Sequence, residues 1–325
     1  MSVKAALPLN HRRGNINVLM RLGVHIPIAG GLLEAVERAK RLGCTTMQIF
    51  SRSPRGGTPP ALNPELAERF NTARRAAGIE PLAVHGPYII NLASPEAAMW
   101  KRSLALYRDE YARASRLRAQ YLVTHVGSHR GDGEAAGLAR VADAVSRTLE
   151  GAPPARTSGS PGRAAGVTIL LENTAGSGQG LGYRFEQLAA IRDAVAARDR
   201  VGICLDTAHL FAAGYAIHTA EGLEETVASF NRLVGLEHLR LIHLNDSKVP
   251  FGSRVDRHWH IGQGHIGSDA FRRIIMHPRL RDVPFILETP KTSEEEDRRN
   301  LATVRRLADG KTSGSRVVVR AKARR

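Results

Sequence analysis

Apolar residues recur along the chain in short runs that alternate with longer amphipathic segments. The short runs are rich in Val, Ile and Leu and are bounded by Gly, Pro or polar residues, which is typical of β-strands. Runs that are almost continuously apolar, such as Val167–Leu171, indicate strands buried on both faces, as in a parallel sheet. The predicted strands are Met20–Ile26, Thr45–Phe50, Pro81–Gly86, Tyr121–Gly127, Val167–Asn173, Val201–Thr207, Leu239–Asp246 and Pro284–Thr289.

An amphipathic segment follows each of these runs. Its apolar residues recur every three to four positions, which predicts a helix with one face on a core. Asn63-Pro64 and Ser94-Pro95 each resemble an N-cap residue followed by proline at the first helical position. The predicted helices are Leu32–Leu42, Pro64–Ala77, Glu96–Ala119, Asp132–Leu149, Arg184–Ala197, Ala220–Val234, Ser268–Ile275 and Glu294–Leu307.

Eight strand–helix units in succession predict an α/β fold, a (β/α)8 TIM barrel that forms a single domain over residues 20–308. An open doubly wound sheet is the main competitor. It would place a glycine-rich phosphate-binding turn after the first strand, where Ala29–Gly31 lacks the full dinucleotide fingerprint. Three segments fall outside the repeating units: an N-terminal extension over 1–19, an insertion over 150–166 and a basic C-terminal tail over 309–325, all expected to be flexible.

Composition adds a strongly basic charge to this picture. The chain has 325 residues and a formal net charge of +16, and residues 1–22 and 311–325 contain basic but no acidic side chains. This balance suits a polyanionic partner such as nucleic acid, although basic termini also serve only to keep a protein in solution. With two cysteines, Cys44 and Cys204, no membrane-length apolar run and no secretory signal, we expect a cytoplasmic, nucleoid-associated protein without disulfides.

Imidazoles and carboxylates gather at the carboxyl ends of the predicted strands, which converge on one face of a barrel. Nine such groups close together would repel one another and shift their pKa values unless cations lay between them. A mixed nitrogen and oxygen ligand set suits Zn²⁺, with Mn²⁺ or Fe²⁺ as substitutes. The nine candidate metal ligands are His85, His125, Glu172, Asp206, His209, His243, Asp256, His258 and Glu288.

Taken singly, each of these residues has an ordinary structural explanation. A histidine at a strand end is more often a hydrogen-bonded structural residue than a ligand, and the spacings Asp206-x-x-His209 and Asp256-x-His258 are weak motifs. The joint placement favours metal binding, because six of the eight predicted strands end in a potential ligand on the same face. A site with several metals at a barrel mouth is suited to hydrolysis of phosphate esters.

Several motifs around these residues resemble those of bacterial endonuclease IV, in order and with matching spacing, over about residues 20–308. They are Gly23-Val-His25 with Ala29-Gly-Gly31, His85-x-x-Tyr88-x-Ile-Asn91-Leu92, His125-x-Gly-Ser-His129, Glu172-Asn-Thr-Ala-Gly-x-Gly178, Cys204-Leu-Asp206-Thr-Ala-His209-x-Phe-Ala-Ala-Gly214-Tyr215, His243-Leu-Asn-Asp246-Ser-Lys248, Phe251-Gly-Ser-Arg-Val-Asp256-Arg-His258, Ile266-Gly267 and Leu287-Glu288-Thr289.

The resemblance implies a TIM barrel with three zinc ions per chain. It implies that Glu172 and Glu288 are the catalytic residues, with Glu172 bridging two metals and Glu288 orienting the nucleophile. Carried over by position, the first zinc takes His85, His125 and Glu172, the second takes Glu172, Asp206, His243 and Glu288, and the third takes His209, Asp256 and His258.

The same resemblance implies a DNA-repair activity. The family hydrolyses the phosphodiester 5′ to an abasic site in double-stranded DNA, leaves a 3′-hydroxyl and a 5′-deoxyribose phosphate, and removes blocked 3′ ends. We expect a monomer with this activity. Arg55, Tyr88 and Ile89 lie where the family inserts side chains at the lesion, although Arg55 could be a simple phosphate contact and the other two ordinary packing residues.

The chain departs from the family pattern in a few places. The loop Ser51–Gly57 is smaller and richer in Gly and Pro, and Gln263, near His260, replaces an acid. These differences, with the insertion and the two termini, bear on lesion preference and DNA affinity, whereas all nine candidate ligands are retained.

Two other functions are compatible with parts of the sequence. A metal-dependent sugar isomerase or epimerase of the same barrel superfamily would use fewer metals, and His209, Asp256 and His258 argue against it. A DNA-binding protein without catalytic activity ranks last, because it would leave the nine-residue array unexplained.

Overall fold

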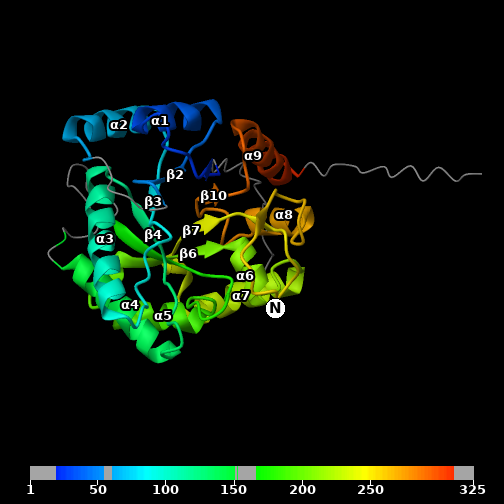
Figure 1. Cartoon of the computed structure of the whole chain (residues 1–325). Helices are drawn as coiled ribbons and strands as arrows, with labels where there is room; N and C mark the ends of the chain where they lie inside the picture. Colours follow the sequence, from blue (N-terminus) through cyan, green and yellow to red (C-terminus); the bar gives the residue numbers. More distant parts are fainter. Residues whose placement is uncertain (1–19, 55–60, 151, 153–165, 311–325) are drawn as a thin grey trace, which may run out of the picture.

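Eight parallel strands wrap into a barrel in the computed structural model, which describes residues 20–54, 61–150, 152 and 166–310 (Figure 1). The hydrogen-bonded order is β1-β10-β7-β6-β5-β4-β3-β2. Each strand lies within a predicted one, so the predicted (β/α)8 barrel and its single domain are confirmed. The strands are β1 Leu22–Val24, β2 Met47–Phe50, β3 Leu82–His85, β4 Tyr121–His125, β5 Thr168–Glu172, β6 Val201–Asp206, β7 Leu239–His243 and β10 Phe285–Leu287.

A parallel bridge helps to join the two ends of this ladder. His25 and Gln48 form an isolated parallel bridge between the end of β1 and β2, and the Ile26 amide donates to the Gln48 carbonyl at 2.7 Å. This pair, which we call the closing bridge, completes the barrel and brings both side chains to the same end of it.

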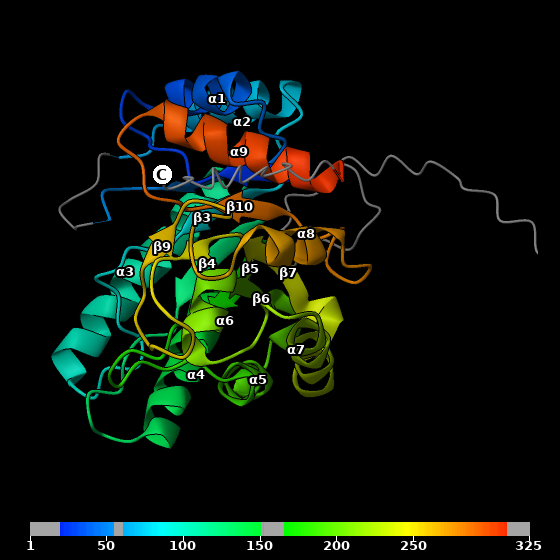
Figure 2. The same cartoon turned by 90° about the vertical axis from the view of Figure 1, so that its right-hand side faces the viewer.

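The predicted helices cover the outside of the barrel. Figure 2 shows α1, α2 and α9 together over one side of it. The Asn63 side chain caps α2 by accepting from the Glu65 amide at 2.8 Å, with Pro64 at the first helical position, as predicted. The helices are α1 Leu32–Arg41, α2 Pro64–Ala76, α3 Ala97–Arg116, α4 Glu134–Leu149, α5 Phe185–Ala194, α7 Ala220–Leu233, α8 Ser268–Met276 and α9 Glu294–Ala308.

The proposed cap of α3 is wrong. This helix begins at Ala97 after Glu96, two residues later than Ser94-Pro95 would place it. Ser94 is fully buried, and its hydroxyl accepts a hydrogen bond from the Glu96 amide at 3.3 Å. The serine therefore stabilises the turn that leads into the helix.

The apolar pattern did not predict a short helix and a small sheet at the barrel mouth. Helix α6 (Thr207–Ala213) begins directly after β6 because the Asp206 side chain accepts from the His209 amide at 2.9 Å. Strands β8 (Asp246–Ser247) and β9 (His258–Trp259) pair in antiparallel fashion. Two single-turn 3₁₀ helices, η1 (Arg198–Arg200) and η2 (Leu236–His238), precede β6 and β7.

A layer of apolar side chains fills the barrel interior just below the mouth. One residue from each of six strands forms this inner layer, and each is at most 1% exposed. Since side chains alternate along a strand, the residue two positions later points into the mouth. The inner layer consists of Ala83, Val123, Leu170, Cys204, Leu241 and Ile286.

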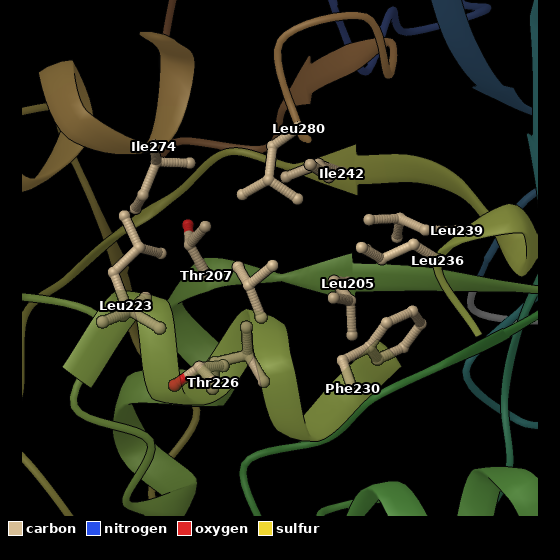
Figure 3. Close-up of a pocket in the computed structure, with 13 residues that line it drawn as sticks. Leu205, Thr207, Leu223, Thr226, Phe230, Leu236, Leu239, Ile242, Ile274 and Leu280 are labelled. Carbon is tan, nitrogen blue, oxygen red and sulfur yellow. The ribbon is translucent and has the colours of Figure 1, made fainter. Parts of the chain in front are cut away.

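An apolar cavity of about 30 Å³ lies outside the barrel, between α7, α8 and strands β6 and β7 (Figure 3). Val227 lines it together with Phe230 and Ile274.

We expect Val227→Ile to fill part of this cavity and to raise the free energy of unfolding by about 0.5–1 kcal/mol. Val145→Ile is the matched control, because this fully buried valine does not line the cavity and overpacking there should destabilise the fold. Urea unfolding of both variants measures the difference, and a loss of stability in Val227→Ile would contradict the prediction.

Within the described ranges, we find no helix with both the length and the apolar composition needed to cross a membrane. Cys44 and Cys204 are both free and buried.

Candidate metal centre

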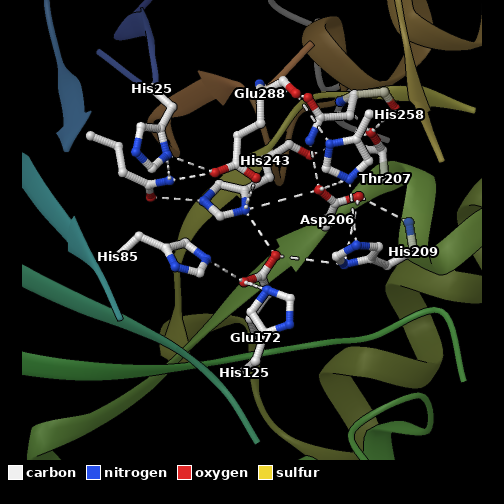
Figure 4. Close-up of polar contacts among 12 residues, drawn as sticks. His25, His85, His125, Glu172, Asp206, Thr207, His209, His243, His258 and Glu288 are labelled. Atoms are coloured by element: carbon white, nitrogen blue, oxygen red, sulfur yellow. Dashed lines mark hydrogen bonds and ion pairs between the residues drawn. The ribbon is translucent and has the colours of Figure 1, made fainter. Parts of the chain in front are cut away.

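Polar side chains from six strands meet at the barrel mouth, directly above the inner layer. Each follows its inner-layer residue by two positions, so the alternation of the strands turns all six toward the barrel axis (Figure 4). The six residues are His85, His125, Glu172, Asp206, His243 and Glu288.

The carboxylate of Glu172 lies at the centre of this array and is fully buried. One oxygen, Oε2, is 3.2 Å from His85 Nε2 and 3.1 Å from His125 Nε2. The other oxygen, Oε1, is 2.9 Å from His243 Nδ1. The two oxygens therefore face two different groups of side chains, which is the arrangement that a bridging carboxylate requires.

Among the residues that the structure describes, three groups of donor atoms are compact enough to hold a metal ion. The first consists of His85, His125 and Glu172. The second places the carboxylates around His243, whose Nδ1 is 3.2 Å from Glu288 Oε2 and 3.9 Å from Asp206 Oδ2. The full membership of the second group is Glu172, Asp206, His243 and Glu288, and that of the third is Asp206, His209 and His258.

The third group depends on the elements that the apolar pattern did not predict. His209 comes from α6 and His258 from β9, and their Nε2 atoms lie 3.4 Å apart. Asp256 is half exposed, with Oδ2 3.2 Å from His209 Nε2 and Oδ1 3.4 Å from His258 Nε2. Asp206 thus lies in both the second and third groups, whereas the resemblance implied a third group built on Asp256.

The electrostatics of the site fit a bound cation. Burial by itself would raise the pKa of Glu172, but the imidazoles of His125 and His243 hold it well below its ordinary value. Burial likewise opposes protonation of His209, yet Asp206 and Asp256 raise its pKa to about 10. The buried carboxylates therefore draw protons onto the imidazoles. Divalent cations among the same nitrogen and oxygen donors would supply that positive charge instead.

Backbone carbonyls fix the orientation of three of the imidazoles. The Nδ1 atoms of His85, His209 and His258 lie 2.7 Å from Gly86 O, 2.9 Å from Asn173 O and 3.2 Å from Glu288 O, respectively. A ring whose Nδ1–H donates to a carbonyl has Nε2 free as a ligand. These three histidines are therefore oriented to bind a metal through Nε2.

Sequence reasoning missed two buried amides that support the site. Gln48 contacts both His243 and Glu288, and Asn245 donates to Asp206 Oδ2 at 2.6 Å while its Oδ1 accepts from the Glu288 amide at 2.7 Å. Gln48 interrupts the otherwise apolar strand Met47–Phe50, which was an available signal. It lies opposite the inner-layer residue Ala83, but that register was not readable from the sequence.

Two of the three residues expected to contact DNA lie exposed near the metal groups. Tyr88 and Ile89, in the loop after β3, are 63% and 48% exposed, and the Tyr88 ring centroid is 5.7 Å from those of His85 and His125. Arg55 lies outside the described residues. Phe251, which sequence reasoning did not select, is also exposed and comes from the loop after β8.

Comparison with known proteins shows one family. The model of the xylose isomerase-like TIM barrel family matches residues 36–307. A relative from Chloroflexus aurantiacus named as a probable endonuclease 4 is 47% identical over 291 residues, which cover 89% of this chain and 99% of the relative.

Solved structures agree with the sequence relatives. The crystal structure of endonuclease IV from Thermus thermophilus superposes with a TM-score of 0.76 at 39% identity, covering 89% of this chain and 99% of that one. D-psicose 3-epimerase from Clostridium cellulolyticum reaches a TM-score of 0.59 at 16% identity, covering 89% of this chain and 99% of that one. The second likeness shows the shared barrel alone.

Proposed function

Because the chain belongs to the endonuclease IV family of xylose isomerase-like TIM barrels, we propose that it is a zinc-dependent hydrolase that cuts DNA 5′ to abasic sites. The products would be a 3′-hydroxyl and a 5′-deoxyribose phosphate, and the same site would remove blocked 3′ ends. The observation that supports the proposal most directly is the buried Glu172 carboxylate. Its two oxygens face two different groups of candidate metal ligands.

The donor atoms suit three zinc ions, with Mn²⁺ or Fe²⁺ as substitutes. His85, His125 and Glu172 would hold the first ion, and Glu172 would share the second with Asp206, His243 and Glu288. His209 and His258 would hold the third, with Asp256 completing its ligands. Bound zinc would act as a Lewis acid that neutralises phosphoryl charge and makes water more acidic.

The residues of the chain would position the reacting groups. Glu288 Oε2 faces the His243 side of the centre, where its carboxylate could orient the attacking water. The burial of Glu172 and Asp206 would exclude bulk water from the carboxylates, so their negative charge would attract the metal cations with little screening. All the candidate ligands come from one chain, which supports a monomer as the active unit.

The exposed side chains at the mouth are suited to a damaged duplex. A missing base leaves a gap in the stack that an apolar or aromatic side chain can fill. Tyr88, whose ring lies beside those of His85 and His125, and the adjacent Ile89 are exposed and would enter that gap. Arg55 would also contact the DNA. A DNA substrate would place the protein at the nucleoid.

Incision of a defined duplex tests the proposal. The protein is stripped with a chelator, reloaded with zinc, and incubated with duplex DNA that contains one abasic analogue. We expect a single cut 5′ to the lesion, with a 3′-hydroxyl at the new end. Chelation should abolish this incision, and zinc should restore it. A second duplex with a blocked 3′ end tests the end-cleaning activity.

An undamaged duplex is the control. Failure of the metal-loaded protein to cut the abasic strand would rule out the proposed activity. Metal analysis of the active protein should give three zinc ions per chain, whereas one or two would favour the sugar isomerase alternative.

A further inference from the structure

Gln48 lies where the inner layer of the barrel meets the candidate metal centre. Its side chain is fully buried, at the level that apolar residues occupy on six other strands. Nε2 lies 2.6 Å from Glu288 Oε1, and Oε1 lies 2.9 Å from His243 Nε2. One amide therefore contacts side chains from two other strands, both of them candidate ligands.

Donor and acceptor chemistry fixes the orientation of this amide. An ionised carboxylate only accepts hydrogen bonds, so the NH₂ group of Gln48 must face Glu288. The amide oxygen then faces His243 Nε2, which can contact it favourably only as an N–H donor. His243 thus keeps a proton on Nε2 whether the ring is neutral or charged, and Nδ1 is the nitrogen that can become free.

The freed nitrogen points into the centre. His243 Nδ1 lies 2.9 Å from Glu172 Oε1 and 3.2 Å from Glu288 Oε2. This is opposite to His85 and His209, whose Nδ1 atoms are held by backbone carbonyls and whose Nε2 atoms face the carboxylates. Among the described residues, no backbone carbonyl accepts a hydrogen bond from the His243 ring. The amide of Gln48 therefore orients this ring, as backbone carbonyls orient the other two.

We infer that Gln48 is a positioning residue that makes His243 a ligand through Nδ1 and holds Glu288 beside it. The role is coupled to barrel closure, because Gln48 and His25 form the closing bridge and His25 Nδ1 also lies 3.1 Å from Glu288 Oε1. The contacts that join β1 to β2 therefore also position a candidate catalytic carboxylate on β10. This inference rests on the metal-binding role of His243 and Glu288 proposed above.

Substitution by methionine tests the inference, because methionine fills similar space without a donor or a strong acceptor. Loss of such a supporting contact lowers metal affinity by about 10–100-fold in comparable sites. We expect Gln48→Met to lose zinc to a competing chelator at correspondingly lower chelator concentration. Thr46→Val is the matched control, since Thr46 is equally buried two residues earlier and loses one hydrogen bond, to Pro81 O at 2.6 Å.

Nitrogen-15 NMR of histidine-labelled, zinc-loaded protein reports which ring nitrogen of His243 carries the proton. Gln48→Glu keeps an acceptor for His243 and should keep the proton on Nε2, whereas Gln48→Met should not hold it there. Circular dichroism verifies that each variant is folded. If the methionine variant is not, the glutamate variant provides the test through its zinc affinity, which should still fall because a carboxylate replaces the donor to Glu288 with a like charge.

The two proposals fail in different ways. If Gln48→Met changes neither the zinc affinity nor the ring nitrogen of His243 that carries the proton, the role of Gln48 is overturned and the proposed function stands. Binding of zinc through Nε2 of His243 in the unaltered protein would also overturn the role of Gln48. A protein that retains no zinc would overturn the proposed function, and this inference with it.

Discussion

Glu172→Gln should reduce incision at an abasic site by roughly 10³-fold or more, the scale expected when a buried group that organises the reacting charges is lost. The carboxylate contacts His85 and His125 through one oxygen and His243 through the other. An amide has the same shape but only one acceptor atom and no charge, so it cannot serve two cations at once. Single-turnover incision with saturating zinc measures the loss.

The fold should survive this change, because glutamine fills the same volume. Glu68→Gln is the matched control: this exposed glutamate on α2 pairs only at the surface, at 2.7 Å from Arg118, and its variant should cut normally. Circular dichroism of both variants separates a catalytic loss from unfolding. Full activity of Glu172→Gln would refute the bridging role.

Glu110→Leu should lower the free energy of unfolding by about 3–5 kcal/mol, the cost of removing one partner from a buried ion pair. Glu110 on α3 is fully buried and pairs with Arg52, which is 4% exposed, while Ser51 donates to its other oxygen at 2.7 Å. Without the carboxylate, the Arg52 guanidinium loses its buried counter-charge. Urea unfolding measures the change.

The neighbouring Asp109 provides a close control. It pairs with the same Arg52 guanidinium, but its side chain is 49% exposed. Solvent screens such a pair, so Asp109→Ala should lower the free energy of unfolding by less than about 1 kcal/mol. An equal decrease in the free energy of unfolding for Glu110→Leu and Asp109→Ala would show that burial does not determine the strength of these contacts. Since Ser51 and Arg52 directly follow β2, Glu110→Leu should also loosen the chain that leads from β2 toward Arg55, and so impair incision.

The alternation of apolar and amphipathic segments was sufficient to predict the barrel. Each strand of the sheet lies inside a predicted one, because burial on both faces leaves a local apolar signal. The predicted strands end at polar residues such as Glu172 and His243. Because the carboxyl ends of barrel strands converge on one face, these residues were expected to share one site. Helix α6 was missed because its seven residues are almost all buried and so show no amphipathic pattern.

The tertiary structure decided how the candidate ligands are grouped. Asp206 lies in two groups and Asp256 at the edge of the third, which depends on the helix start that turns His209 inward and on the pairing of β8 with β9. These placements depend on side-chain direction and on contacts between segments far apart in sequence.

The sequence by itself determined the fold, the end of the barrel that carries the chemistry and the residue types available there, because strand periodicity and strand-end position are local properties. The tertiary structure alone determined which atoms face one another. The register between strands placed Gln48 level with the inner layer and next to His243, and the closing bridge brought His25 to Glu288. Register and closure arise from the packing of the whole barrel, so no local pattern encodes them.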